Sequence, residues 1–534
     1  DLSKLFKATF TDEPSLMSCF MRAQPHAVLP WAGNLAPEFR RRRGYDLMPR
    51  LAGLVVDGDP RVRYDFWQTV ADLVSENYFG QIQKRCRELG VPAGGHLLME
   101  ESFRGDVQLY GDFMACARGL DAPSIDMLTS IPSQVPWSIA RLISSVAELE
   151  GRELTMSETS DHSQRYRPQG DTRPVVVVTA DEILGTINRQ VVGGINTITS
   201  YYSFAGLDQP TMEHLNLYTG RICTALRGGH QVADVAVVYP VNSLWPHTEP
   251  AKGVGSPDPA SVEVEQAYNG TLDAVFKSGR DATILDAKAI VDSRVEGNKL
   301  VHGNLAWSVL VLPAAETLPA AAWERIGAFW AAGGAVIGIG RRPLNQPDQF
   351  PSAAAKALGE RMFGSGEQAA TITGPNGARG IWLPSGAASL LPRAFDLLIG
   401  RDVELPKGAP LRTTHRRVDG RDVYFIINDS ATAWQGQVTL AGAGAGELCD
   451  PDTGKRTALA GNQVTLDLPA YRGMILRYER AVDRARRQPE AGPLMLGKPT
   501  PLPTVTPTVG GGEFVAGEPV TTGKLPDGRT SWHF

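Results

Sequence analysis

The sequence TFTDEP, residues 9–14, ends a short apolar run with two adjacent carboxylates and a proline. The run from Leu5 to Thr11 is predicted to be a β-strand that stops at Asp12, because Pro14 cannot continue a strand ladder. Parallel strands of α/β enzymes present catalytic groups just after their carboxyl ends. Asp12 and Glu13 are therefore the first candidates for a functional site.

The same strand-and-helix unit recurs four times before residue 230. Further strands are predicted at Ala93–Met99, Ser124–Leu128, Glu153–Met156 and Ile195–Ser200. Segments with apolar residues at helical spacing separate them, at Arg61–Leu89, Gln108–Arg118, Trp137–Leu149 and Ala180–Val192, with a last one at Met212–Leu226. This alternation predicts parallel βαβ units and favours a (β/α)8 barrel over residues 1–230. A doubly wound sheet is the alternative, but its usual glycine-rich loop after the first strand is missing.

Beyond the barrel the sequence pattern changes twice. Residues 231–345 predict a flavodoxin-like α/β domain with buried strands such as Gly334–Gly340, and its first strand lacks a phosphate-binding glycine fingerprint. Residues 346–399 are rich in Pro, Gly and Ala and predict a connecting region. Apolar residues then alternate with a period of two, which predicts a small antiparallel β-sandwich over 400–480. Residues 481–534 form a Pro/Gly-rich tail.

The composition indicates which kinds of molecule the protein is expected to bind. A chain of 534 residues with 42% hydrophobic and 21% charged residues is ordinary globular material for roughly three domains. Its formal net charge of −5 gives no basic field for nucleic acid or an anionic membrane. The sequence contains no run of 18 apolar residues, which is the length that a membrane-spanning helix needs. The expected partner is a neutral or polar small molecule.

Cysteine usage gives no sign of a disulfide framework or a metal site. The five cysteines, Cys19, Cys86, Cys116, Cys223 and Cys449, are far apart and lack a C-x-x-C pair. They are expected to be buried free thiols. No His/Cys/Asp spacing indicates metal ligation, so neither a metal nor another cofactor is expected from the pattern. Because the chain begins Asp-Leu-Ser, its location stays open, with a secreted or periplasmic one favoured over the cytoplasm.

Glu13 and Glu158 form the candidate catalytic pair. Glu158 belongs to a polar cluster, Ser157–His162, that follows the fourth predicted strand. Two glutamates on separate strand ends can face each other across the mouth of a barrel. Glycoside hydrolysis needs such a pair, with one carboxyl as acid. The second acts as nucleophile about 5–5.5 Å away, or as base for water at ~6.5–9.5 Å.

Polar and aromatic residues near the other strand ends are candidates for substrate binding. Carboxylates and imidazoles bind sugar hydroxyls, and aromatic rings stack on the apolar C–H face of a sugar. The candidates are Asp12, Trp31, His96, Glu101, Trp137, His162, Tyr201 and Tyr202. Each has an ordinary structural alternative, such as core packing for His96 and Trp137 or a salt bridge for Glu101. Of the adjacent acids Glu100 and Glu101, only one can face the mouth, and Glu101 is preferred.

The positions of the two glutamates resemble those of clan A glycoside hydrolases. In that clan the acid/base glutamate follows strand four and the nucleophile follows strand seven. The resemblance implies that the chain holds strands four to eight of the barrel and is N-terminally incomplete. Glu13 would end strand four and Glu158 strand seven. Clan A usually has Asn before the acid/base residue, where this sequence has Asp12.

Two families share further features with the sequence. The order of barrel, flavodoxin-like domain and β-sandwich resembles family 42 β-galactosidases and family 164 β-mannosidases, which implies a homo-trimer through residues 231–345. The phrases GYDL (44–47), RYDFW (63–67) and VYP (238–240) resemble family 106 α-L-rhamnosidases. Members of that family invert and use calcium, which implies a calcium ligand at Glu101.

The sequence therefore predicts a glycosidase acting in carbohydrate or polysaccharide degradation. The preferred form is a retaining, exo-acting enzyme on a β-linked galactoside or mannoside, with Glu13 as acid/base and Glu158 as nucleophile. An inverting α-L-rhamnosidase, with Glu101 or Glu158 as base, is the first alternative. A non-catalytic carbohydrate-binding or assembly protein is the second. The retaining mechanism calls for apolar surroundings at Glu13 and hydrogen-bond donors at Glu158.

Overall fold

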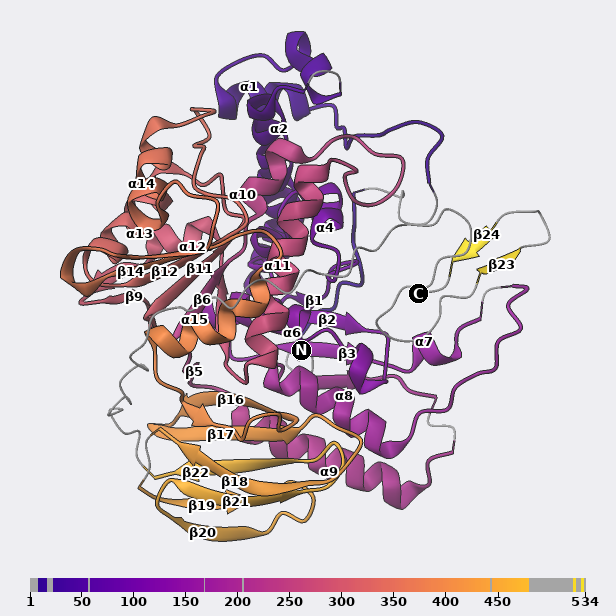
Figure 1. Cartoon of the computed structure of the whole chain (residues 1–534). Coiled ribbons are helices and arrows are strands. Elements are labelled where there is room, and N and C mark those ends of the chain that lie inside the picture. Colours follow the sequence, from indigo (N-terminus) through magenta and orange to yellow (C-terminus); the bar gives the residue numbers. More distant parts are fainter. Residues whose placement is uncertain are drawn as a thin grey trace.

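A parallel sheet forms the centre of the N-terminal region in the computed structural model (Figure 1). Its strands are β1 (Gly94–Gly95), β2 (Ala122–Met127), β3 (Met156–Thr159) and β4 (Thr197–Ser200), and they pair in this order. Thr11 adds a parallel bridge to Gly95. Residues 9–11 therefore lie beside β1 as a fifth parallel segment.

The structure describes most of the chain. Part of the predicted first strand, Cys19 and nearly all of the tail lie outside the described residues. Those residues are 8–16, 23–55, 58–167, 169–203, 206–441, 444–479, 522–524 and 530–532. None of the helices among them combines the length and the apolar character that crossing a membrane demands.

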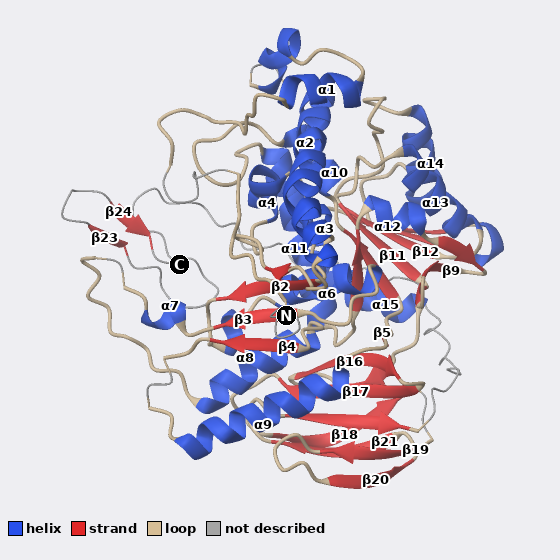
Figure 2. Ribbon diagram, turned by 180° about the vertical axis from the view of Figure 1, so that it is seen from behind, coloured by secondary structure: helices blue, strands red, loops and turns tan. Residues whose placement is uncertain are grey.

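Helices follow each strand of the parallel sheet. They are α1 (Leu35–Arg43), α2 (Pro60–Val74), α3 (Gln81–Glu88), α4 (Phe103–Tyr110), α5 (Phe113–Ala117), α6 (Trp137–Leu149), α7 (His162–Arg165), α8 (Ala180–Val192) and α9 (Gln209–Leu226). Figure 2 shows α8 and α9 between the sheet and the β-strands of the C-terminal region. Asp59 caps α2, and Thr179 with Glu182 forms a capping box at α8.

Two predicted helices are interrupted. The predicted helix Arg61–Leu89 contains a π-helical turn, Ser75–Gly80, between α2 and α3. The predicted helix Gln108–Arg118 is divided into α4 and α5 at Gly111, whose φ is 76°. A side chain at Gly111 would place its first carbon 2.4 Å from the backbone nitrogen of Ala71. Close packing against α2 therefore needs a glycine there and breaks the helix.

Two strands differ from their predicted bounds. β1 is limited to two residues instead of Ala93–Met99, and Gly95 adopts a φ of 142° against the backbone of Thr11. β3 begins at Met156, where the predicted strand Glu153–Met156 would end. Glu158 thus lies inside β3, opposite Asp126 of β2. The polar composition of β3 hid it from pattern analysis, because its side chains face a polar site and not a core.

The second region is an α/β domain around a six-stranded sheet. The strand order is β13 (Ala370–Thr373), β14 (Arg379–Leu383), β12 (Ala335–Ile339), β11 (Val309–Pro313), β6 (Val235–Val238) and β7 (Ala282–Leu285). All neighbours are parallel except β13. Its helices are α10 (Val241–Leu244), α11 (Pro259–Lys277), α12 (Ala287–Asp292), α13 (Ala320–Ala331), α14 (Ala353–Phe363) and α15 (Leu391–Leu398), and a three-stranded ribbon comprises β8 (Arg294–Glu296), β9 (Lys299–His302) and β10 (Leu305–Trp307).

The prediction that residues 346–399 form a connecting region is wrong. It contains α14, β13, β14 and α15, and β14 pairs with β12 over five residues. The alanine-rich composition that suggested a connection builds helix α14, whose Leu358, Met362 and Phe363 are buried. The α/β fold therefore continues past residue 345.

The C-terminal region consists of two antiparallel sheets. One contains β15 (Val403–Glu404), β18 (Trp434–Leu440) and β21 (Gln463–Leu468). The other contains β20 (Arg456–Ala460), β19 (Ala445–Cys449), β22 (Gly473–Tyr478), β17 (Arg421–Asn428), β16 (Leu411–Val418) and β5 (His230–Gln231). Leu411, Ile426, Val438, Leu466 and Leu476 fill the space between them. β5 precedes the α/β domain in sequence, so it ties the start of that domain to the sandwich.

The carboxyl edge of the α/β sheet is packed against helices of the N-terminal region. The Trp245 indole donates to the Gly111 carbonyl, and the Trp67 indole donates to the Thr248 carbonyl, both at 2.8 Å. Asn242 donates to the Tyr64 hydroxyl at 2.9 Å. These buried contacts close the edge at which open α/β sheets usually bind ligands.

A buried charged cluster joins all three regions. Arg141 of α6 and Asp281, just before β7, are 2.8 Å apart, and their side chains are 1% and 7% exposed. The Thr414 hydroxyl, from β16, donates to Asp281 at 2.9 Å. Arg141 also donates to the Val192 carbonyl. Asp281 thereby links the parallel sheet, the α/β domain and the sandwich.

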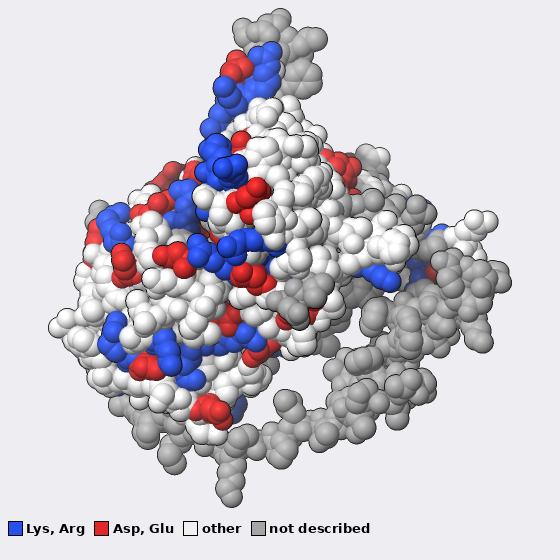
Figure 3. All heavy atoms as spheres, turned by 90° about the horizontal axis from the view of Figure 1, so that it is seen from above, with Lys and Arg blue, Asp and Glu red and all other residues white. Residues whose placement is uncertain are grey.

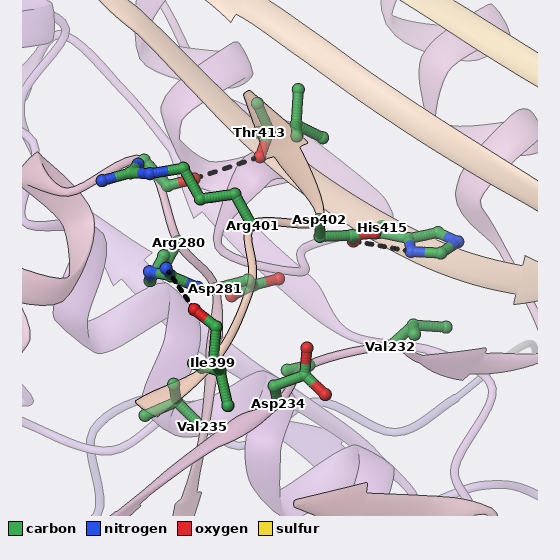
Figure 4. Close-up of a pocket in the computed structure, with 13 residues that line it drawn as sticks. Val232, Asp234, Val235, Arg280, Asp281, Ile399, Arg401, Asp402, Thr413 and His415 are labelled. Carbon is green, nitrogen blue, oxygen red and sulfur yellow. Dashed lines mark hydrogen bonds and ion pairs between the residues drawn. The ribbon is translucent and has the colours of Figure 1, made fainter. Parts of the chain in front are cut away.

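Figure 4 shows the charged cavity beside this junction. Asp234, Arg280, Asp281, Arg401, Asp402 and His415 line it. His415 lies between two carboxylates, with Nδ1 2.8 Å from Asp402 and Nε2 3.1 Å from Asp422. Arg280 donates to the Gly400 carbonyl and to Asp396. The boundary between the α/β domain and the sandwich is therefore polar and closely paired.

Charges of both signs are interspersed on the face shown in Figure 3. The run Arg40–Arg43 of α1 is the densest basic stretch, and acidic side chains face it. Arg42 pairs with Glu38 and Glu76, and Arg43 pairs with Asp72. The pair of Arg43 with Asp72 joins α1 to α2, and the pair of Arg42 with Glu76 joins α1 to the π-helical turn.

We expect Asp281→Ala to lower the free energy of unfolding by about 3–5 kcal/mol, because it leaves the Arg141 guanidinium buried without its counter-charge. Adding Arg141→Met should recover part of that loss. Urea unfolding monitored by circular dichroism measures both. Asp273→Ala is the control, because its pair with Lys277 is exposed on both sides and should cost no more than about 1 kcal/mol. A double variant as unstable as Asp281→Ala alone would contradict the assignment.

Candidate active site

Acidic side chains from consecutive strand ends gather around His96. Asp12 and Glu13 follow the Thr11 bridge, Asp126 lies in β2, and Glu158 lies opposite it in β3. Glu13 has a φ of 47°, which is rare for a residue with a side chain. Such backbone strain is concentrated at functional sites, where the surrounding structure holds a side chain in a required direction.

His96 occupies the centre of this cluster. It is 1% exposed, and its Nε2 lies 3.0 Å from Asp12 while its Nδ1 lies 3.8 Å from Glu158. Phe10 packs edge-on against the imidazole at 5.2 Å between ring centroids. Burial lowers the pKa of His96, although the nearby Asp12 opposes this shift. The ring is therefore neutral at physiological pH.

Crowding of carboxylates favours their protonated forms. Burial raises the pKa of Glu13, and the charges of Asp12, Glu101 and Glu158 raise it further. Burial and the charge of Glu158, with smaller effects from other acids, raise the pKa of Asp126 from 3.8 to about 7. Burial, followed by Asp12, raises the pKa of Glu158 as well. The cluster holds protons that isolated carboxyls would release.

The surroundings of Glu13 are not the apolar ones expected, because the charges of Asp12, Glu101 and Glu158 act on it. Its partial burial and raised pKa suit a group that donates a proton. The hydrogen-bond donors expected at Glu158 are not found among the described residues, and the pKa of Glu158 is raised instead of lowered. That expectation is therefore wrong for the structure without ligands.

Glu100 and Glu101 have different surroundings, as successive residues facing opposite sides should. Glu100 is buried and accepts a hydrogen bond from the Asp126 backbone at 3.1 Å. It therefore supports the backbone of β2. Glu101 is exposed, and its charge acts on both Glu13 and Asp126.

Asp126 is the member of the site that sequence reasoning missed. It lies in the predicted strand Ser124–Leu128, where it was treated as an ordinary strand residue. Its Oδ1 is buried and has no hydrogen-bond partner among the described residues. A lone carboxylate inside an apolar strand that feeds the candidate edge was the available signal.

Two of the predicted substrate-binding residues, Tyr201 and Tyr202, have different surroundings. Tyr201 is 46% exposed, its hydroxyl bonds Ser160, and the charges of Asp126 and Glu158 reach it. It lies in the cluster with Asp12, His96 and Glu101. Tyr202 is buried, and its hydroxyl accepts a hydrogen bond from Ser130.

The other predicted substrate-binding residues lie in varied places. Trp137 is 5% exposed and stacks on Phe276 of α11, so it packs between regions. His162, in α7, stacks on Tyr166 with ring centroids 5.0 Å apart. Trp31 is 51% exposed in the loop before α1. No contact described for these three residues joins them to the carboxylate cluster.

Three residues of the cluster are close enough to share a cation. One ligand atom each from Glu13, His96 and Asp126 lies within 4.8 Å of the others. Carboxylate oxygens suit hard cations such as Ca²⁺, whereas imidazole nitrogen suits transition metals. The surplus of carboxylates over imidazole at this place fits an oxygen-binding cation.

Comparisons with known proteins place the chain among glycoside hydrolases. A model of the family Glyco_hydro_106, described as alpha-L-rhamnosidase, matches residues 26–462. A solved rhamnosidase from Novosphingobium sp. PP1Y superposes with a TM-score of 0.60 at 19% identity, over 88% of this chain and 46% of that one. A GH42 β-galactosidase from G. stearothermophilus superposes with a TM-score of 0.57 at 12% identity, over 87% and 78%.

A further similar protein is much longer than this chain. A protein of Formosa agariphila, to which β-glucuronidase activity is attributed, is 21% identical over 446 residues, which is 77% of this chain and 33% of that protein. The chain thus spans about a third of this relative and less than half of the solved rhamnosidase. At these identities the likeness to solved structures concerns the fold.

We expect Asp126→Asn to stabilise the protein at pH 8 but not at pH 4. The raised pKa means that the carboxyl stabilises fully below about pH 3.8, and this contribution is lost as pH rises through about 7. The neutral amide avoids the loss, for a gain of about 1–2 kcal/mol after allowance for partial exposure. Chemical unfolding in a chelator at both pH values measures it.

Asp419→Asn, on an exposed turn, is the matched control and should change stability by less than about 0.5 kcal/mol at either pH. An equal effect of Asp126→Asn at both pH values would contradict the proposed crowding of carboxylates.

Proposed function

The chain belongs to glycoside hydrolase family 106, and from this membership we propose that it hydrolyses α-L-rhamnosides with inversion at the anomeric carbon. The observation that carries the proposal is the pair Glu13 and Glu158 beside the buried His96. The first has the environment of an acid, and the second faces a polar gap. This arrangement can protonate a leaving oxygen and activate water.

Glu13 is the proposed general acid and Glu158 the proposed general base. Four influences raise the pKa of Glu13, namely burial and three carboxylates, whereas burial and one carboxylate raise that of Glu158. Burial and the neighbouring carboxylates thus favour a proton on Glu13. Efficient proton donation near neutral pH needs such a raised pKa, and efficient proton removal needs an ionised base.

We also propose that the parallel sheet is part of a (β/α)8 barrel, with the Thr11 segment and β1 to β4 as strands four to eight. The likeness in fold to the rhamnosidase and the GH42 enzyme supports a barrel-like fold, and the strand numbers rest on the sequence resemblance to clan A. In such barrels the carboxyl ends of the strands carry the catalytic groups, which is where the cluster lies.

A retaining enzyme acting on a β-galactoside or β-mannoside is the second candidate. The resemblance in fold to a GH42 β-galactosidase, over 78% of that enzyme, favours it. Glu158 would then attack the anomeric carbon directly. A non-catalytic sugar-binding protein would show no turnover on either class of substrate.

Calcium is the cation proposed for the cluster. Asp126, with its unpartnered buried oxygen, and Glu101 would hold it, and a bound calcium would supply electrostatic attraction for sugar hydroxyls. Their oxygen atoms fit the preference of calcium, and Glu13 stays free to donate its proton. Neutralising the crowded carboxylates would also relieve their mutual repulsion.

A homo-trimer through the α/β domain, and a secreted or periplasmic location, are further proposals. The trimer rests on the order of the three regions and on the sequence resemblance to family 42 enzymes. Light scattering of the purified protein measures the oligomeric state.

The anomer formed first distinguishes the two mechanisms. With p-nitrophenyl α-L-rhamnoside, proton NMR should show β-L-rhamnose before mutarotation, because water attacks opposite the leaving group. Glu13→Gln should lose about 10²–10⁴-fold in kcat on an alkyl rhamnoside and less on a dinitrophenyl one, whose leaving group needs no acid. Initial α-rhamnose, or turnover of β-galactosides alone, would contradict the proposal.

Removal of calcium should abolish most of the activity. Dialysis against a calcium chelator is expected to lower kcat/KM at least about tenfold, and added Ca²⁺ should restore it. Asp126→Asn should raise the Ca²⁺ concentration needed for half-activation by about 10- to 100-fold, as the loss of a charged ligand usually does. Full activity in the chelator would exclude the calcium proposal and leave the rest intact.

A further inference from the structure

His96 and Glu158 are close enough for a single oxygen atom to hydrogen-bond to both side chains. Nδ1 of His96 and Oε2 of Glu158 are 3.8 Å apart. An oxygen at about 2.8 Å from both atoms would make two hydrogen bonds of ordinary length. Nδ1 is buried and has no hydrogen-bond partner among the described residues. A buried polar atom without a partner in a native structure indicates a missing water or ligand.

We propose that His96 and Glu158 together bind the attacking water of the hydrolysis, and that His96 orients it. The inference rests on the proposed inverting function and adds a water-positioning residue to it. The imidazole would act by fixing where the lone pairs of the water point, and Glu158 would remove the proton.

Asp12 fixes the tautomer that this role needs. Its Oδ1 lies 3.0 Å from Nε2, and a carboxylate oxygen accepts a hydrogen bond from an imidazole N–H. The proton of the neutral ring is therefore on Nε2, which leaves a lone pair on Nδ1. Without Asp12 the two tautomers would compete. This gives Asp12, the residue before the proposed acid, a role that does not involve direct contact with the sugar.

The ring is held in one orientation. The His96 backbone donates to the Thr11 carbonyl at 3.0 Å, and Phe10 packs edge-on against the imidazole. Both contacts come from the segment that leads into Glu13. The acid and the water site are therefore positioned by the same few residues.

The geometry assigns both protons of the water. One O–H donates to Nδ1 of His96 and the other to the Glu158 carboxylate, so a lone pair is left for the anomeric carbon. In the reaction the water oxygen bonds to that carbon while the bond to the leaving oxygen breaks. Glu158 takes one proton, and Glu13 gives its proton to the leaving oxygen. The second water proton stays on the new anomeric hydroxyl, still bonded to Nδ1.

Two substitutions at His96 separate the proposed role from a purely structural one. The side-chain amide of His96→Asn can offer an oxygen near the position of Nδ1, whereas that of His96→Gln reaches the position of Nε2 and the contact with Asp12. We expect His96→Gln to lower kcat on an aryl α-L-rhamnoside by about 10- to 100-fold, as the loss of one hydrogen bond to a reacting group would. His96→Asn should lose less than about fivefold, and KM should change less than about threefold in both.

Azide gives a second, independent readout. Glu158→Ala with azide should form β-L-rhamnosyl azide, because the anion attacks without a base. Adding His96→Gln to Glu158→Ala should not slow azide formation, since no water needs to be oriented. His214→Asn is the control, because His214 on α9 also lies 3.0 Å from an aspartate, Asp452, outside the cluster. It should leave kcat unchanged.

The outcomes separate this inference from the proposed function. Inverting turnover with His96→Asn slower than His96→Gln, or an equal loss in the azide reaction, would overturn the role of His96 and leave the rhamnosidase intact. Initial retention of configuration would overturn it as well, because Glu158 would then be the nucleophile. No hydrolysis of any rhamnoside by the unchanged protein would overturn both.

Discussion

The ion pair between Arg141 and Asp281 is the constraint on which the arrangement of the three regions depends. Both groups are almost completely removed from water, so each needs the other, and Thr414 satisfies a further lone pair of the carboxylate. Arg141 lies on α6, the helix between the strands that carry Asp126 and Glu158. The distance between Asp126 and Glu158 therefore depends, through α6, on how the α/β domain and the sandwich pack against the N-terminal region.

The carboxylate cluster around His96 shows the opposite electrostatic design. Its carboxylates crowd one another with little compensation from cations in the described part of the chain, and the pKa values of Glu13, Asp126 and Glu158 are all raised. Such a site is poorly stabilised on its own and gains from anything that brings hydroxyl donors or positive charge. Arg141 and Asp281, in contrast, compensate each other's charge, and the backbone of Glu13 has a strained φ of 47°.

Sequence periodicity predicted the elements well where one face of them is apolar. The helices α6 and α8 follow their predicted bounds. The pattern failed where side chains face a polar site, so β3 was displaced and Asp126 was overlooked. The pattern also failed at Gly111, where a close contact with α2 breaks the helix. It failed again in residues 346–399, where β14 pairs with β12. Both are tertiary contacts, which local periodicity does not reveal.

The covered edge of the α/β sheet has a mechanical consequence. In open α/β folds the crevice where strand order reverses, here between β6 and β11, is usually free for a ligand. In this protein, helices of the N-terminal region pack against this edge of the sheet. Hydrogen bonds of Trp245, Trp67 and Asn242 hold them there. A hinge rotation of one region against the other would have to break all three buried bonds at once. These three bonds therefore oppose rotation of the α/β domain against the N-terminal region.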